Sequence, residues 1–245
     1  MEQAKILFAE AVENNLDLKV KNARWKRWST CSLCEQRYHG VVACALGWAC
    51  WKTCIGRPEG KWARFAAMSV LGNGLDAANQ HEDALSVREA ELSMLRRAGA
   101  REENILAAQS GLANTYQKLG RYERALEMYR HLYSVSLKLE GEEHKSTLVD
   151  AFNYAHCLIT LKRYAETKAL LRKIAPVARR VLGDSHELTL RVQTNYALSL
   201  YEDPAATLDD LRESVTTFEE TARICLLYTS PSPRDATLSR MPSSA

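Results

Sequence analysis

The sequence lacks a long apolar run and any pattern of an N-terminal leader. Lys5, Glu10 and Glu13 interrupt residues 1–20, so no apolar core of a signal peptide forms there. The longest apolar run, residues 41–51, is well short of the ~20 residues that a membrane helix needs. We therefore expect no membrane partner and a cytoplasmic location.

The sequence also lacks a large excess of charge of either sign, and it lacks recognisable catalytic motifs. The 33 lysine and arginine residues against 30 acidic residues leave a net charge of +3, too small to favour a nucleic-acid partner by itself. We find no Gly-rich phosphate loop, no nucleophile elbow and no His-x-x-x-His pattern. These absences favour a protein that is not an enzyme. With 46% hydrophobic residues over 245 positions, the chain is long enough to bury a core as a soluble globular protein.

What the sequence has instead is an internal repeat. The run at residues 111–130 returns at residues 153–172, and a fainter copy begins at Asn195. Between the copies, the connector Gly141-x-x-His144 returns as Gly183-x-x-His186, and 183 minus 141 gives a period of 42. A fixed period of this size indicates stacked helical hairpins, because one hairpin cannot bury its apolar face alone.

The order of residue types within a copy identifies the repeat. A leucine, a small residue, an aromatic, a glycine, an alanine and a second aromatic follow one another at helical spacing: Leu112, Ala113, Tyr116, Gly120, Ala125 and Tyr129. This order resembles the tetratricopeptide repeat, although the period exceeds the usual ~34 residues. The longer period and the Leu-Gly-x-x-His connector are similar to the kinesin light chain subtype. The resemblance implies an all-α fold, a right-handed solenoid of helical hairpins.

We divide the chain into three parts. Residues 1–58 form a cysteine-rich helical segment, residues 62–224 about four repeats, and residues 225–245 a disordered or artefactual tail rich in Ser, Pro and Arg. The first repeat, residues 62–97, is degenerate, with Arg88 where an aromatic belongs, as a capping repeat would be. The second helix of the fourth repeat is expected at residues 207–224. The tail suggests an array truncated at both ends.

The resemblance also implies a peptide-binding groove along the first helices of the repeats. The residues that would face it are Asn153, His156 and Asn195, with Asn114, Gln117 and Arg191 nearby. Asparagine offers both donors and an acceptor to a peptide backbone; the alternative is that these residues only cap or solvate the array. His144 and His186 recur at one repeat position, so we expect them to cap helices rather than to catalyse.

Five of the seven cysteines lie between Cys31 and Cys54, which suits a metal or free thiols better than a disulfide framework. Cys31-x-x-Cys34 presents two thiolates on one side of a turn, as zinc needs, but two ligands must come from elsewhere. The surrounding residues resemble the last third of a RING-variant zinc domain, most of whose ligands are missing. Candidates to complete the site are His39, Cys44, Cys50 and Cys54; alternatively, residues 41–51 are a buried helix with apolar cysteines. A redox role of the pair is the weaker alternative.

The basic segment at residues 19–28 holds Trp25 and Trp28 among lysines and arginines. Such a segment can stack bases, or it can be a solvated helix end whose tryptophans pack against a zinc knuckle. We favour the second interpretation because the net charge is low.

The sequence thus predicts a non-catalytic scaffold that binds protein or peptide partners. The alternative is a fragment of a RING-type ubiquitin ligase or adaptor whose repeats select the substrate. No heptad coiled coil, as in a motor light chain, precedes the repeats. The pattern does not determine the oligomeric state.

Overall fold

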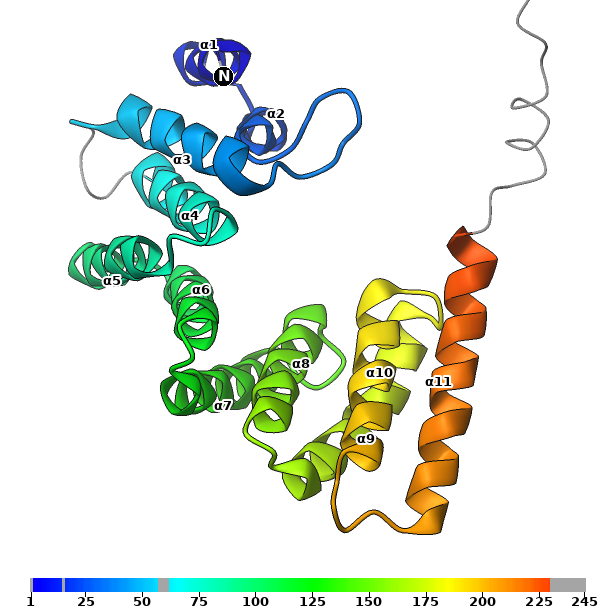
Figure 1. The fold of residues 1–245 in the computed structure, drawn as a ribbon. Helices are drawn as coiled ribbons and strands as arrows, with labels where there is room; N and C mark the ends of the chain where they lie inside the picture. The colour runs from blue at the N-terminus through cyan, green and yellow to red at the C-terminus, as the bar shows by residue number, and fades with distance from the viewer. Residues whose placement is uncertain (1, 15, 57–61, 230–245) are drawn as a thin grey trace, which may run out of the picture. The chain divides into compact units, whose positions relative to one another are not determined.

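The computed structural model describes residues 2–14, 16–56 and 62–229, and this part of the chain is all-α (Figure 1). Its helices are α1 (Glu2–Glu13), α2 (Leu18–Trp25), the short 3-10 helix η1 (Lys26–Trp28), α3 (Gly40–Cys54), α4 (Trp62–Ala77), α5 (His81–Arg97), α6 (Glu102–Lys118), α7 (Tyr122–Leu139), α8 (Lys145–Thr160), α9 (Tyr164–Leu182), α10 (Glu187–Tyr201) and α11 (Leu208–Thr229). Over the same residues there is no strand, and Thr30 and Arg37 form an isolated antiparallel bridge. None of the described helices is long and apolar enough to cross a bilayer.

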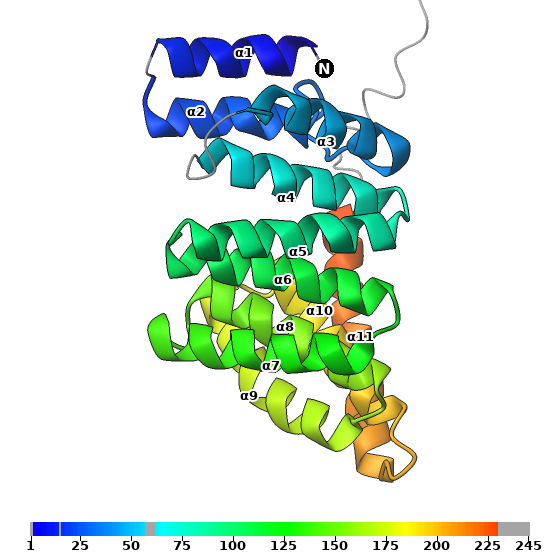
Figure 2. The same cartoon turned by 90° about the vertical axis from the view of Figure 1, so that its left-hand side faces the viewer.

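The chain divides into two compact units, residues 1–128 and 129–245, and α7 contains the division. In the first unit α3 packs on α4, α4 on α5, and α5 on α6 (Figure 2). In the second unit α10 packs against α8, α9 and α11, and α8 packs against α9. Each unit is therefore a stack of helices that follow one another along the chain, as the repeat period predicts.

The turns inside the hairpins recur with the repeat. Asn79, Gly120 and Lys162 have φ angles of 60°, 72° and 57°, and they lie 41 (120 − 79) and 42 (162 − 120) residues apart. At each, the following residue donates its N–H to the carbonyl five positions back, as Arg121 does to Tyr116 at 2.9 Å. This left-handed residue closes the preceding helix, so the glycine of the repeat pattern, Gly120, lies in the turn between the two helices.

The connector histidines cap helices, which confirms the interpretation of His144 and His186. The His144 side chain accepts from the N–H of Ser146 at the start of α8, and His186 accepts from the N–H of Leu188 at the start of α10, at 3.1 Å. Each satisfies one of the N–H groups that a helix start leaves without an intrahelical partner. The recurring histidines are structural.

The tryptophans of the basic segment pack into the N-terminal core. Trp28 is 1% exposed, and the ring of Trp25 lies 4.7 Å from that of Phe8 and 5.0 Å from that of Trp62 in edge-to-face arrangements. Aromatic pairs with this geometry stabilise a core beyond the area they bury. The tryptophans are therefore used in packing, although the ring neighbours of Trp25 are Phe8 and Trp62 rather than the expected zinc knuckle.

Helix α3 has a buried face and an exposed face. Cys50 and Cys54 are fully buried, while Val41 is 78% exposed. Burial raises the pKa of the Cys50 thiol, with the neighbouring Cys54 adding to the rise. These two cysteines behave as small apolar residues, in agreement with the buried-helix alternative.

Arg88 is buried at the contact of α4, α5 and α6, where the repeat pattern has an aromatic. Its Nη2 donates to Asp76 Oδ2 at 3.2 Å and to Asn73 Oδ1 at 2.7 Å, and its Nε donates to Thr115 Oγ1 at 2.9 Å. A Cβ on Gly111 would collide with the guanidinium. A buried arginine needs such partners because a charge without them is costly in a low-dielectric core.

The fourth hairpin ends later than the sequence suggests. Pro204 lies in the turn between α10 and α11, and α11 continues to Thr229, five residues past the predicted end at residue 224. The rest of the predicted tail, residues 230–245, and residues 57–61, where the first two predicted parts meet, lie outside the described residues.

Candidate functional site

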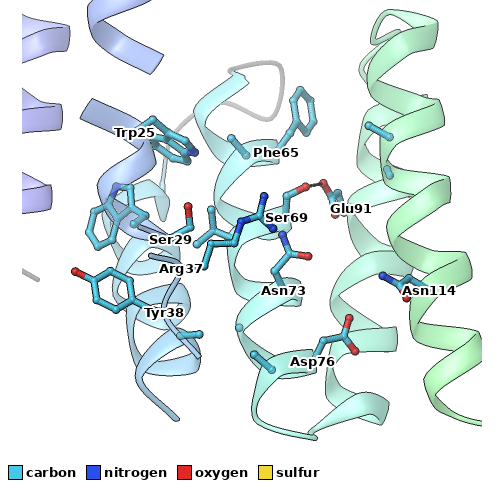
Figure 3. A pocket seen from close by; sticks show the side chains of 18 of the residues that line it. Trp25, Ser29, Arg37, Tyr38, Phe65, Ser69, Asn73, Asp76, Glu91 and Asn114 are labelled. Atoms are coloured by element: carbon cyan, nitrogen blue, oxygen red, sulfur yellow. Dashed lines mark hydrogen bonds between the residues drawn. The ribbon is translucent and has the colours of Figure 1, made fainter. Parts of the chain in front are cut away.

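A pocket of about 620 Å³ opens in the first unit, along the inner faces of α4 and α6 (Figure 3). Its wall on α4 is a strip of side chains one helical turn apart, Phe65, Ser69 and Asn73. The segment after η1 and helix α6 supply further lining residues on either side of this strip. Its full lining is Trp25, Trp28, Ser29, Arg37, Tyr38, His39, Ala43, Trp62, Phe65, Ala66, Ser69, Val70, Asn73, Gly74, Asp76, Ala77, Glu91, Leu95, Asn104, Ala107, Ala108, Asn114 and Lys118. First helices of two successive hairpins therefore share one cavity.

Two carboxylate side chains line this pocket, and they differ in how many partners surround them. Asp76 is held by Arg88, by His81 Nδ1 at 3.1 Å and by Lys118 Nζ at 3.9 Å. Glu91, 2% exposed, accepts a hydrogen bond from Ser69 through Oε1, while its Oε2 has no hydrogen-bond partner in the described part of the chain. Burial raises the pKa of Glu91, against the lowering by Ser69 and by the charge of Arg88.

Of the two predicted groove residues in the first unit, one lines the pocket. Asn114 on α6 is exposed and points at the cavity (Figure 3). Gln117, half-buried on the same helix, is not part of the lining. The sequence pattern missed Asn73, although it lies 41 residues before Asn114 (114 − 73), so the repeat offset could have found it. Glu91 was missed because the next copy has Leu132 at its position (91 + 41), so no recurring polar residue marks it.

In the second unit, two predicted groove residues meet on one aromatic ring. The rings of Phe152 and His156 are stacked at 6.1 Å with an angle of 7° between their planes, and Arg191 Cζ lies 4.6 Å from the centre of the Phe152 ring. His156 comes from α8 and Arg191 from α10, the first helices of successive hairpins. A guanidinium over a ring keeps its N–H donors free at the edges, so this cluster can donate to a carbonyl or carboxylate.

The charge of the cluster comes from Arg191. Burial lowers the pKa of His156, and the positive charge of Arg191 lowers it further. His156 is therefore neutral at pH 7 and offers one donor and one acceptor, while Arg191 also pairs with Glu187 at 3.5 Å.

The two remaining predicted residues differ in accessibility. Asn153, next to Phe152 on α8, is half-buried. Asn195 on α10 is only 8% exposed, and its Nδ2 is covered and forms no hydrogen bond to any described residue. The sequence pattern places Asn195 at the surface of a groove, whereas the structure covers it, because it sits among the packed residues of α10. Its role as a peptide contact stays a prediction.

The Cys31-x-x-Cys34 segment forms a tight turn. The N–H of Cys31 donates to the carbonyl of Gln36 at 2.9 Å, and Glu35 has a φ angle of 57°. The backbone N–H groups of Cys34 and Leu33 point at the Cys31 sulfur and, with the Cys34 side chain, lower the pKa of the Cys31 thiol to about 7. Donors of this kind favour a thiolate, so the turn suits two ligands of a soft metal.

The turn does not complete a zinc site with the described residues, among which no group of three or more His, Cys, Asp or Glu side chains is arranged to hold a metal. Of the residues considered for the other ligands, Cys50 and Cys54 are buried in α3 and the thiol of Cys44 donates to Gln80 at 3.4 Å. A closed structural zinc site has four ligands. Two thiolates are half of that set, and we derive no function from zinc.

We expect the reduced, chelator-washed protein to hold well under one zinc ion per chain, because two thiolates alone bind zinc weakly. Metal analysis of the wild type beside a Cys31→Ser, Cys34→Ser double variant checks this. About one zinc per chain, lost in the double variant, would instead show that further ligands complete the site and would favour the ubiquitin-ligase alternative.

The structure is a stack of helical hairpins, with a residue of left-handed backbone conformation in the turns and histidine caps at two helix starts. This fold is that of tetratricopeptide repeat proteins. Residues 105–145, from α6 to the start of α8, match the tetratricopeptide repeat family.

Solved structures with kinesin light chain-like repeats share the fold over most of the chain. A candidate kinesin light chain of Podosopora anserina with nearly identical TPR-like repeats is 17% identical, with a TM-score of 0.60 over 94% of this chain and 97% of that one. A single-residue variant of that protein gives a TM-score of 0.62 at 16% identity, over 94% and 96% of the two chains. BtubC (BKLC) of P. vanneervenii gives 0.61 at 17% identity, over 80% and 77%. No curated protein sequence matches the chain significantly.

Proposed function

We propose that this protein is a non-catalytic scaffold that binds extended peptide segments of partner proteins along the first helices of its hairpins. The observation that carries the proposal is the pocket on α4 and α6, where the amides of Asn73, Asn104 and Asn114 line one cavity beside aromatic walls. Amide side chains bond a peptide backbone, and aromatic walls take up apolar side chains. That combination suits a peptide better than a small charged metabolite.

The second unit supports the same function with different groups. His156 and Arg191 lie on the Phe152 ring and leave polar N–H groups exposed on α8 and α10. The equivalent helices of both units thus carry side chains that can bond a peptide. The kinesin light chain-like repeats of the similar structures agree with a role in protein interactions.

The alternative, a ubiquitin-ligase fragment, depends on zinc at Cys31 and Cys34 and stays a hypothesis that the metal analysis tests. Cytoplasmic location, the absence of catalysis and the absence of a nucleic-acid partner likewise stay predictions.

An Asn114→Ala variant is expected to bind a selected peptide about tenfold more weakly than the wild type, since one hydrogen bond is worth about 1 kcal/mol and its loss leaves the peptide group unpaired. A random peptide library displayed on phage is selected against the full chain, and the best peptide is synthesised with a fluorescent label. Its Kd is then measured by anisotropy for each variant.

The matched control is Asn22→Ala, which makes the same chemical change at an exposed position on α2 outside the pocket. Its Kd should equal that of the wild type. The proposal would be contradicted if the library yielded no binding peptide. It would also be contradicted if the Asn114→Ala variant bound the selected peptide as tightly as the wild type does.

A further inference from the structure

Glu91 is the chemically unusual member of the pocket. Its side chain comes from α5, is 2% exposed, and meets Ser69 of α4 at the pocket wall (Figure 3). The second oxygen, Oε2, has no hydrogen-bond partner among the described residues. A buried carboxylate oxygen without a donor costs free energy comparable to a lost hydrogen bond. A group kept at this cost beside a cavity marks a place where a ligand supplies the missing donor.

The neighbouring cations do not supply that donor. Arg88, one turn earlier on α5, donates to Asp76, Asn73 and Thr115. Lys118 faces Asp76 at 3.9 Å. Arg37 lines the same pocket from the segment after η1 (Figure 3), yet leaves Oε2 without a hydrogen bond. The buried, unpaired oxygen of Glu91, a residue of the pocket lining, therefore calls for a donor from outside the chain.

The number of unpaired oxygens on Glu91 selects the kind of donor. Glu91 Oε1 is already taken by Ser69, so one oxygen remains. A guanidinium binds best to both oxygens of a carboxylate at once, whereas an ammonium is a point charge that one oxygen can serve. The aromatic rings of Trp25 and Phe65 line the same cavity (Figure 3) and suit the methylene stem and the charge of a lysine.

We propose that this pocket receives a lysine side chain of the bound partner, whose ammonium group donates to Glu91 Oε2 while its methylene stem packs along Phe65. The inference rests on the proposed function, because it names the side chain that the scaffold takes in its first unit. Its test is independent of peptide binding, since a lysine derivative can enter the pocket without the rest of a peptide.

The probe is Nα-acetyl-lysine N-methylamide, titrated into the full chain. Trp25, Trp28 and Trp62 line the pocket, so their indole N–H resonances in NMR spectra report its occupation. We expect these resonances to shift with saturation in the wild type. The norleucine analogue, which keeps the stem and lacks the ammonium, should cause no such shift.

Two variants test the electrostatic part. Glu91→Gln keeps the shape and the bond to Ser69 but removes the charge, and is expected to weaken binding of the lysine derivative about tenfold. Arg37→Gln removes a positive charge from the lining and should strengthen binding.

Because burial raises the pKa of Glu91, the folded protein binds the proton more tightly than the unfolded chain, and ionisation costs stability above pH ~4.5. Glu91→Gln should therefore fold with an equal or higher Tm at pH 7.

Equal shifts with the norleucine analogue, unchanged affinity in Glu91→Gln, or tighter binding of the corresponding glutamate derivative would each overturn the inference. A peptide selected for the proposed function that binds without any lysine would overturn it too, while leaving the scaffold intact. If no peptide binds but the lysine derivative does, the scaffold proposal fails and the site stands as a pocket for free primary amines.

Discussion

Replacing Arg88 by leucine is expected to destabilise the first unit by about 3 kcal/mol, the cost of removing one partner of a buried ion pair. The change removes the donors to Asp76 and Thr115 and leaves the Asp76 carboxylate, 5% exposed, in a buried site. His81 and Lys118 still lie beside Asp76, so we expect the lower end of the ~3–5 kcal/mol range.

The measurement is urea unfolding followed by tryptophan fluorescence. All five tryptophans, at residues 25, 28, 48, 51 and 62, lie within residues 1–128, so the signal reports the first unit. A double variant, Arg88→Leu with Asp76→Leu, should recover part of the loss because no unpaired buried charge remains. A single variant as stable as the wild type would mean that the network contributes no net stability.

Gly74→Ala is expected to destabilise the contact between α3 and α4 by about 1–3 kcal/mol, as overpacking does. A Cβ at this position would lie 2.5 Å from the carbonyl oxygen of Ala43 and 2.9 Å from Cys44 Cα. Both are backbone atoms of α3, so no side-chain rotation relieves the clash. Alanine is favoured over glycine inside a helix by about 1 kcal/mol, so any net loss reflects the collision.

The matched control is Gly72→Ala on the same helix. There the added Cβ meets side-chain atoms of Arg88 at 3.3 Å rather than backbone atoms at 2.5 Å, and the expected loss is smaller. Tryptophan fluorescence gives both unfolding midpoints, and limited proteolysis shows whether residues 40–54 become accessible. Equal midpoints for the two variants would show that α3 can shift away at little cost.

The fold could be predicted from the sequence because the information repeats. Each copy of the 42-residue pattern predicts the same helical hairpin. The connector histidines could be assigned as caps because His144 and His186 occupy one repeat position. The turns between paired helices at Gly120 and Lys162 follow from the same period, although only the first of these residues is a glycine.

The chemistry of the pocket could not be predicted in the same way. Arg88 stood out as a break in the pattern, but its partners come from two other helices, α4 and α6, and become neighbours only in the folded unit. Glu91 resembles any polar residue of an amphipathic helix, and its burial depends on the packing of α4 against α5. The coverage of Asn195 likewise depends on tertiary packing, which a period shared by several hairpins does not encode.

The setting of Arg88 also limits how the array can be rearranged. The first hairpin requires Gly111 and Thr115 in the hairpin that follows it, because one makes room for the guanidinium and the other binds it. One period later the same positions hold Asn153 (111 + 42) and Cys157 (115 + 42), which would obstruct the arginine and leave it without that acceptor. The first two hairpins are therefore matched to each other, and a duplication or deletion that separated them would leave the guanidinium without its space and without that acceptor.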